Sequence, residues 1–169
     1  MQRRKFLHAA AVAAAGTAAG CGPSSPWRFL TVKEGRTLDA ICACLIPPDS
    51  DAGAAEAGVI HYIDRQLTRR FREHQKTYRD GLAAADRLAG GDFAGAAAEP
   101  QADVLQQIER GADTRAFFNL VVTHSMQGFY GNPRHGGNRD FASWRMLRIP
   151  PTQVRGRYEP VQGAANEKS

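Results

Sequence analysis

The chain has 169 residues, the size of one ordinary domain, and its 43% hydrophobic content excludes a wholly disordered chain. The formal net charge of +5 resembles that of a nucleic-acid-binding protein, but residues 1–20 hold three basic and no acidic residues. Without them, 19 basic and 17 acidic residues leave a charge of +2, which gives no reason to expect a nucleic-acid partner.

Residues 1–20 have the pattern of a cleavable export signal. A short basic start precedes an alanine-rich run that is too short and too weakly apolar to span a membrane. The pair Arg3-Arg4, followed by Phe6 and Leu7, resembles the twin-arginine motif. We therefore expect export of the folded protein by the twin-arginine translocase and a periplasmic location.

Cys21 directly follows this signal and raises the question of lipidation. The stretch Ala18-Ala19-Gly20-Cys21 resembles a lipoprotein processing site, which predicts an acylated cysteine and membrane attachment. Ala18 and Gly20 would also suit an ordinary signal peptidase, so both processing routes remain open. Residues 21–30, rich in Gly, Pro and Ser at their start, are predicted to be a tether.

Helical periodicity dominates from Thr31 onward, and no alternation typical of a strand persists. Thr31 and Glu34 form a predicted capping box, and Pro47-Pro48 ends the first helix. A second helix is predicted from Ala54, and a third, charged helix ends at Gly90-Gly91. The apolar faces expected to build the core in these three helices are Leu38, Ile41, Cys42 and Leu45; Val59, Ile60, Ile63 and Leu67; and Phe71, Tyr78, Leu82, Ala85 and Ala89.

Two further helices complete the predicted bundle. The fourth starts at Glu99-Pro100 and ends at Gly111. The fifth starts at Asp113 or Thr114, ends near Gly128, and is the most apolar, so we expect it at the centre of the core.

The region after the fifth helix changes character. Residues 128–138 are rich in Gly, Pro and Asn but also contain two aromatic residues, which predicts an ordered loop. A short helix is then expected to fold back onto the core through Phe141, Trp144, Leu147 and Ile149. Residues 150–169 are predicted to be a flexible tail. The predicted fold is a single small all-α domain of about five helices over residues 31–149.

Motifs for cofactor or metal binding are missing from the sequence. It has no haem-attachment motif, no dinucleotide-binding glycine pattern and no phosphate-binding loop, and its histidines lack metal-ligand spacing. Cys42 and Cys44 lack the second half of a zinc motif and are expected to be buried helical residues. His124, on the apolar fifth helix, is expected to be a core histidine with a hydrogen-bond partner. We predict no catalytic residue, cofactor or metal site in this chain.

Several motifs together resemble the gluconate 2-dehydrogenase subunit 3 family, the small subunits of membrane-bound, flavin-dependent sugar and polyol dehydrogenases. The resemblance covers roughly residues 31–149. Its motifs are Leu38, Ile46-Pro47, Gly53-Ala54, Ala57-Gly58-Val59, Tyr62-Ile63-Asp64, Phe117-Phe118, His124, Gly128-Phe129-Tyr130-Gly131-Asn132-Pro133, Gly136-Gly137-Asn138 and Trp144.

This resemblance implies that the chemistry belongs to other subunits. One is an FAD-dependent dehydrogenase subunit of the glucose–methanol–choline type, and a multihaem cytochrome c subunit with haem c is a possible third. The small subunit would be non-catalytic and would support folding, export and stability of the FAD-bearing subunit. Two alternatives remain: a free-standing periplasmic lipoprotein that acts as a binding module, and a hydrolase or metal enzyme that uses His124 or His135.

The Gly/Pro-rich loop is the predicted partner interface, because aromatic residues in a pre-ordered loop can bind with little loss of entropy. The residues expected at this interface are Phe129, Tyr130, Asn132, His135 and Asn138. The competing interpretation is that Phe129 and Tyr130 fill the core of the domain.

Overall fold

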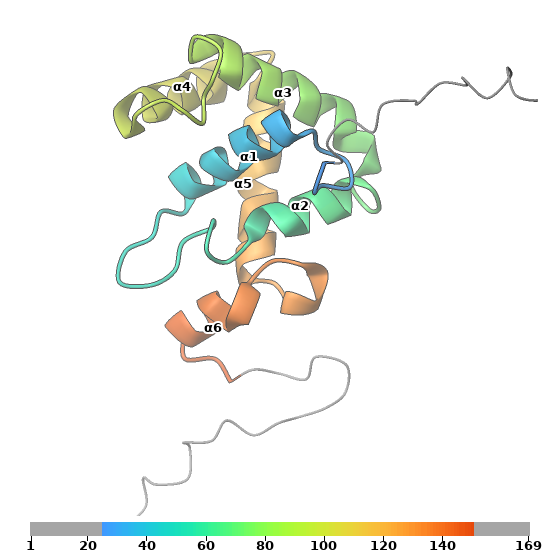
Figure 1. Ribbon diagram of the computed structural model, residues 1–169, viewed down its shortest axis with the longest axis vertical. Coiled ribbons are helices and arrows are strands. Elements are labelled where there is room, and N and C mark those ends of the chain that lie inside the picture. The colour runs from blue at the N-terminus through green and yellow to red at the C-terminus, as the bar shows by residue number, and fades with distance from the viewer. Residues whose placement is uncertain (1–24, 151–169) are drawn as a thin grey trace, which may run out of the picture.

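The computed structural model describes residues 25–150 (Figure 1). The predicted signal residues Arg3, Arg4, Phe6 and Leu7, together with Cys21, lie outside the described residues. So does the predicted tail from residue 151 onward.

The described residues form helices and contain no strand, which confirms the predicted all-α fold. Three short 3-10 turns, η1 (Arg72–His74), η2 (Pro133–His135) and η3 (Arg139–Phe141), occur between the α-helices. The α-helices are α1 (Val32–Leu45), α2 (Val59–Leu67), α3 (Gln75–Leu88), α4 (Ala98–Arg110), α5 (Arg115–Tyr130) and α6 (Ala142–Met146).

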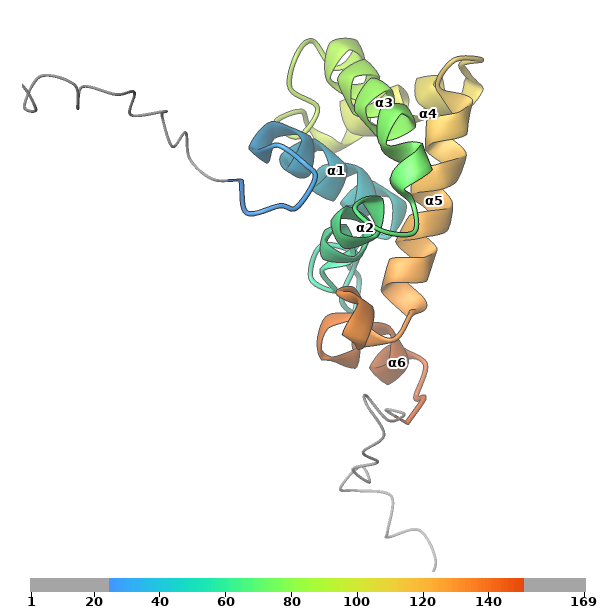
Figure 2. The same cartoon turned by 90° about the vertical axis from the view of Figure 1, so that its right-hand side faces the viewer.

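Helix α5 is the central helix of the bundle, as its apolar sequence predicted. It runs along the long axis of the domain and contacts α1, α2, α3, α4 and α6 (Figures 1 and 2). Phe117, Val121 and Phe129 on its inner side are almost completely buried. Helix α3 approaches closely at Gly81, where a Cβ atom would collide with the Phe117 ring. A glycine at this position therefore allows the helices to pack at short range.

Three helix boundaries differ from the sequence prediction. Helix α2 begins at Val59 and not at Ala54, because Gly58 adopts the left-handed conformation, with φ of 67°. Helix α3 begins at Gln75, and the buried Phe71 lies before it in the connection from α2. Such boundaries depend on packing that local sequence does not encode.

The third difference concerns the end of α5, which continues past Gly128 to Tyr130. Gly128 does not end the helix, because its role is close packing against α2. A Cβ atom there would lie 3.0 Å from Tyr62 Cδ1 and 3.2 Å from Val59 Cγ1. Phe129 and Tyr130 therefore belong to the last turn of α5 and not to the loop.

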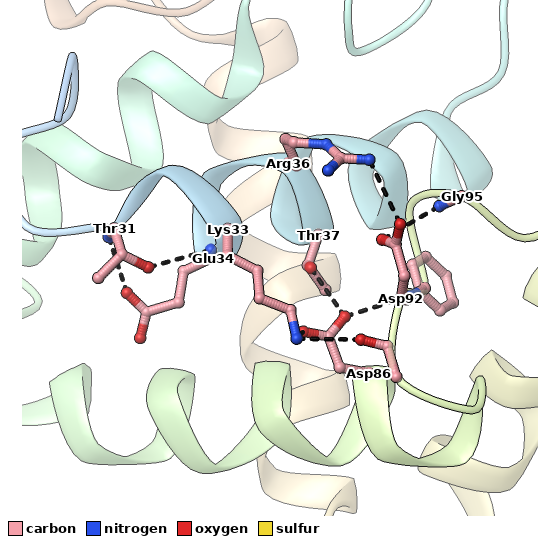
Figure 3. Close-up of polar contacts among 10 residues, drawn as sticks. Thr31, Lys33, Glu34, Arg36, Thr37, Asp86, Asp92 and Gly95 are labelled. Atoms are coloured by element: carbon pink, nitrogen blue, oxygen red, sulfur yellow. Dashed lines mark hydrogen bonds and ion pairs between the residues drawn. The ribbon is translucent and has the colours of Figure 1, made fainter. Parts of the chain in front are cut away.

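Polar contacts join α1 to α3 and to the loop that follows it (Figure 3). The predicted capping box is present: the Glu34 backbone N–H donates to Thr31 Oγ1, and the Thr31 N–H donates to the Glu34 carboxylate. Asp86 of α3 accepts hydrogen bonds from the Thr37 hydroxyl at 2.9 Å and from the Phe93 N–H at 3.2 Å. Its second carboxylate oxygen lies 3.1 Å from Lys33 Nζ. One carboxylate thus fixes two helices and a loop.

A buried carboxylate holds the segment before α1. Asp64 of α2 is 4% exposed and accepts backbone hydrogen bonds from Arg28, Phe29 and Leu30 at 2.8, 3.0 and 3.1 Å. Leu30 enters the core, and the Trp27 indole covers Gly35 of α1. The described part of the predicted tether, residues 25–30, is therefore docked on the domain.

Candidate partner-binding surface

The loop after α5 folds back onto the end of that helix through one buried amide. Asn138 is fully buried, and its Nδ2 donates to the Gly131 carbonyl at 2.9 Å. Its Oδ1 accepts a hydrogen bond from the Ser143 N–H at 3.0 Å. Asn138 thus ties the first residue after α5 to the start of α6.

Two side chains of α6 bind the last carbonyls of α5, which have no partner within their own helix. The Ser143 hydroxyl donates to the Phe129 carbonyl at 2.6 Å, and Trp144 Nε1 donates to the Tyr130 carbonyl at 2.9 Å. Gly137 lies directly against the backbone of Gly128, where a Cβ atom would collide with the carbonyl. The glycines of the loop therefore permit close contact, and the loop is ordered as predicted.

This region also holds unusual backbone conformations. Among the described residues, every non-glycine residue with positive φ lies between positions 138 and 148. These residues are Asn138, Asp140, Phe141 and Arg148, with φ of 48°, 53°, 58° and 55°. Each such conformation is costly for a residue with a side chain and persists only where surrounding contacts enforce it. Backbone strain of this kind is found preferentially at functional sites.

The structure separates the five predicted interface residues into two groups. Phe129 is 2% exposed and Asn138 is fully buried, so their side chains belong to the interior of the domain. Tyr130 is 44% exposed, and Asn132 and His135 are half-buried. The competing interpretation thus holds for Phe129 but not for Tyr130, although the two rings are in edge-to-face contact.

Asn132 and His135 both have local partners. The Asn132 side chain accepts a hydrogen bond from the Arg134 N–H at 3.0 Å and so caps η2. The Nε2 atom of His135 lies 3.0 Å from Arg134 Nε. Desolvation, followed by the positive charges of Arg134 and Arg65, lowers the pKa of His135. The neutral form of this ring is therefore favoured at the surface.

Further exposed apolar side chains lie at the same end of the molecule. Leu147 and Ile149 are 49% and 43% exposed, so the prediction that they fold back onto the core is wrong. Met126, 43% exposed, lies one turn before Tyr130 on α5. We refer to Met126, Tyr130, Leu147 and Ile149 as the apolar end surface. For the part of this surface on α5, the sequence signal was the spacing of Met126 and Tyr130 by four residues, which places both on one side of the helix.

His124 is a core residue, as predicted. It is 3% exposed, its Nδ1 lies 2.8 Å from the Tyr78 hydroxyl, and the Phe71 ring stacks on it at 3.8 Å. Burial, followed by the neighbouring His74, lowers the pKa of His124 to about 4. A neutral, enclosed imidazole in this position stabilises the core and has no access to a substrate.

The cysteines and the remaining acidic groups give no sign of a metal centre. Cys42 is fully buried, its Sγ lies 3.4 Å from Ser125 Oγ, and burial raises its pKa to about 12, which keeps it a thiol. Cys44 is only half-buried. Within residues 25–150, no cluster of three or more His, Cys, Asp or Glu residues could hold a metal ion. Helices in the same range are also too short or too polar to cross a bilayer.

A groove of about 410 Å³ lies between α1 and α3. Five charged side chains line it, and four of them form ion pairs with one another: Lys33 with Asp86 and Arg79 with Glu34. Small-molecule sites are mostly apolar with a few convergent polar groups, so this groove is a poor candidate.

The geometry thus places exposed apolar side chains at the end of α5 and just after α6, beside a strained loop that buried hydrogen bonds tie to α5. Such a surface is typical of a protein that binds another protein. Comparison with known families agrees. The model of the family "Gluconate 2-dehydrogenase subunit 3" matches residues 32–151, and the chain belongs to this family. The chain is therefore a subunit of a dehydrogenase complex that contains other subunits. Searches of curated proteins and of solved structures found no significant match.

Proposed function

We propose that this chain is a non-catalytic small subunit of a flavin-dependent sugar or gluconate dehydrogenase that faces the periplasm. In this proposal it supports the folding, export and stability of an FAD-bearing subunit of the glucose–methanol–choline type. A multihaem cytochrome c subunit is a possible third component. Membership of the subunit 3 family is the observation that carries the proposal.

The apolar end surface is the proposed contact with the FAD-bearing subunit. Of the six large hydrophobic residues that are exposed in the described chain, four form this surface, and the other two are Val32 and Leu88. Exposed aromatic residues on a rigid support are typical binding hot spots, because little entropy is lost on docking. Tyr130 meets both conditions, since its carbonyl accepts a hydrogen bond from Trp144 while the residue is 44% exposed.

The proposed export role depends on the N-terminal signal. FAD is inserted in the cytoplasm, so a loaded flavoprotein has to cross the membrane folded. A small subunit with a twin-arginine signal that includes Arg3 and Arg4 could carry its bound partner through the translocase. Lipidation at Cys21 would then keep the complex at the membrane.

Copurification from native membranes tests the proposed complex and its interface. The wild-type chain is expected to recover a stoichiometric flavoprotein, detected by flavin absorbance. The Tyr130→Ala variant is expected to lower this recovery about tenfold or more, with a change of less than about 1 kcal/mol in its own stability. Leu88→Ala is the matched control, since Leu88 is 43% exposed outside the apolar end surface, and it should retain the flavoprotein.

Two results would contradict the proposal. A wild-type chain that is isolated as a lone monomer would favour a free-standing binding module. Normal periplasmic dehydrogenase activity in an Arg3→Lys/Arg4→Lys variant would exclude export of the flavoprotein by this signal. Mass spectrometry of the mature N-terminus decides separately whether Cys21 is acylated.

A further inference from the structure

Charge is distributed very unevenly over the described domain. Residues 65–76 hold five basic residues and one acidic residue, whereas residues 92–113 hold five acidic residues and one basic residue. The first stretch covers the end of α2 and the connection to α3, and the second covers α4 and its flanks. Figure 1 shows α4 well apart from the α2–α3 connection. The near-neutral total therefore conceals a basic side and an acidic side.

The basic side presents its cations to solvent. Arg69, Arg70, Arg72 and Lys76 are all exposed, and so is Arg28 on the neighbouring N-terminal segment. Lys76 is paired with Asp80 at 2.6 Å, but no ion pair within the described residues involves Arg69 or Arg70. We call these five residues, Arg28, Arg69, Arg70, Arg72 and Lys76, the basic face.

The N-terminal segment is fixed to this same side. Asp64, which binds the amides of Arg28, Phe29 and Leu30, lies one helical turn before Thr68, where the basic connection begins. The guanidinium of Arg79 in α3 also lies 4.5 Å from the centre of the Phe29 ring. Residues 25–30 therefore lie against α2 and α3, close to the basic face, and Figure 2 shows this blue segment beside α1 and α2.

The short connection limits how far the start of the docked segment can be from a membrane anchor at Cys21. Cys21 precedes Ser25 by four residues, which span at most about 14 Å. Attraction between basic residues and an anionic bilayer falls off within about one Debye length, roughly 8 Å at physiological ionic strength. A tether this short lets a domain held by lipid on Cys21 lie against the bilayer, and in that position these cations come within a Debye length of the headgroups.

We propose that the basic face docks on the anionic phospholipid surface to which the N-terminal segment holds the domain. This proximity rests on the export signal of the proposed function, whereas the electrostatic attraction depends only on the described residues. The large apolar side chain of the connection, Phe71, is buried, so binding depends on charge and requires anionic lipid. The apolar end surface, formed by other helices, stays available for a protein partner.

Vesicle binding by the purified full-length chain tests this proposal. Vesicles of mixed phosphatidylcholine and phosphatidylglycerol are compared with vesicles of phosphatidylcholine alone, in sedimentation assays at low and high salt. The Arg69→Gln/Arg70→Gln variant is expected to bind the anionic vesicles about 30-fold more weakly, from about a fivefold loss for each cation removed. The matched control is Arg87→Gln/Arg110→Gln, which changes the net charge equally at exposed positions outside the basic face.

The control should lose less than about threefold, since its cations lie outside the contact. An equal loss in both variants would overturn the proposal, because net charge alone would then explain binding. Unchanged binding of the anionic vesicles by the Arg69/Arg70 variant would overturn it too, because these cations would then not contact the lipid. The assay uses the isolated chain, so its result is independent of whether a flavoprotein copurifies.

Discussion

Two non-helical segments of this domain, residues 25–30 and the loop after α5, are each bound by one buried side chain. Asp64 binds the first and carries a carboxylate, whereas Asn138 binds the second and carries a neutral amide. The Asp64 carboxylate accepts three hydrogen bonds, which the backbone N–H groups of residues 28–30 donate. Asn138 binds its own loop through one donor and one acceptor contact, both to backbone. Outside contacts also help both: the Arg79 guanidinium lies 4.5 Å from the Phe29 ring, and Ser143 and Trp144 bind the end of α5 beside Asn138. The charged carboxylate nevertheless binds three amides, whereas the neutral amide makes two contacts.

This difference predicts how each segment should respond when its buried side chain is removed. Removal of Asp64 leaves three amides without their partner, and hydrogen bonds to a charged acceptor are stronger than neutral ones. Removal of Asn138 leaves two groups unpaired, while the contacts from Ser143 and Trp144 remain. The N-terminal segment should therefore detach as a unit, and the C-terminal loop should loosen in part.

The largest expected effect is that of Asp64→Ala. We expect a loss of about 3–5 kcal/mol in the free energy of unfolding, because three amides lose a charged acceptor and Leu30 loses its anchor to the core. Urea denaturation followed by circular dichroism measures this loss. Asp39→Ala is the matched control, since the buried Oδ1 of Asp39 has no hydrogen-bond partner, and it should change stability by less than about 1 kcal/mol. Similar losses in both variants would show that the three contacts to Asp64 contribute little.

A smaller effect is expected at Asn138, where two variants separate backbone strain from hydrogen bonding. Asn138→Ala should cost about 2–3 kcal/mol, because alanine loses both hydrogen bonds and disfavours the left-handed conformation. Asn138→Gly should cost about 1 kcal/mol less, since glycine accepts φ of 48° without strain. Urea denaturation of both variants measures the difference, and equal losses would mean that the backbone conformation carries no cost.

The smallest expected effect is the contribution of His124 to the pH dependence of the free energy of unfolding. His124 titrates near 6.5 when unfolded and near 4 when folded, because burial and His74 disfavour its charged form. Between these pH values the unfolded chain binds more protons, so stability falls as the pH drops from 6.5 to 4. The contribution is roughly 1–3 kcal/mol.

Urea denaturation at pH 7 and at pH 4.5 checks this pH dependence in wild-type protein and in His124→Gln. The variant should lose less stability than wild type over the same interval, since glutamine does not titrate. An identical pH dependence in both proteins would place the acid sensitivity elsewhere.

Local sequence was sufficient for most of the helices because their signals are local. The capping box at Thr31 and Glu34 and the apolar spacing that includes Leu38 and Ile41 depend on neighbours within two turns. The glycines, proline and asparagines of residues 131–138 likewise indicate a loop from local composition alone. Gly128 was misleading, because a glycine that ends a helix and one that allows close helix packing look alike in sequence.

Tertiary structure alone decided the contacts that span the chain. Asp64 binds amides 34 to 36 positions away, and the sequence around it is that of an ordinary helix. The assignment of Phe129 to the core and Tyr130 to the surface also required the helix to continue past Gly128, since one residue turns a helical side chain by about 100°. Periodicity identifies which residues share a helix face, but only the packing of α5 against α2 and α6 determines which faces are covered.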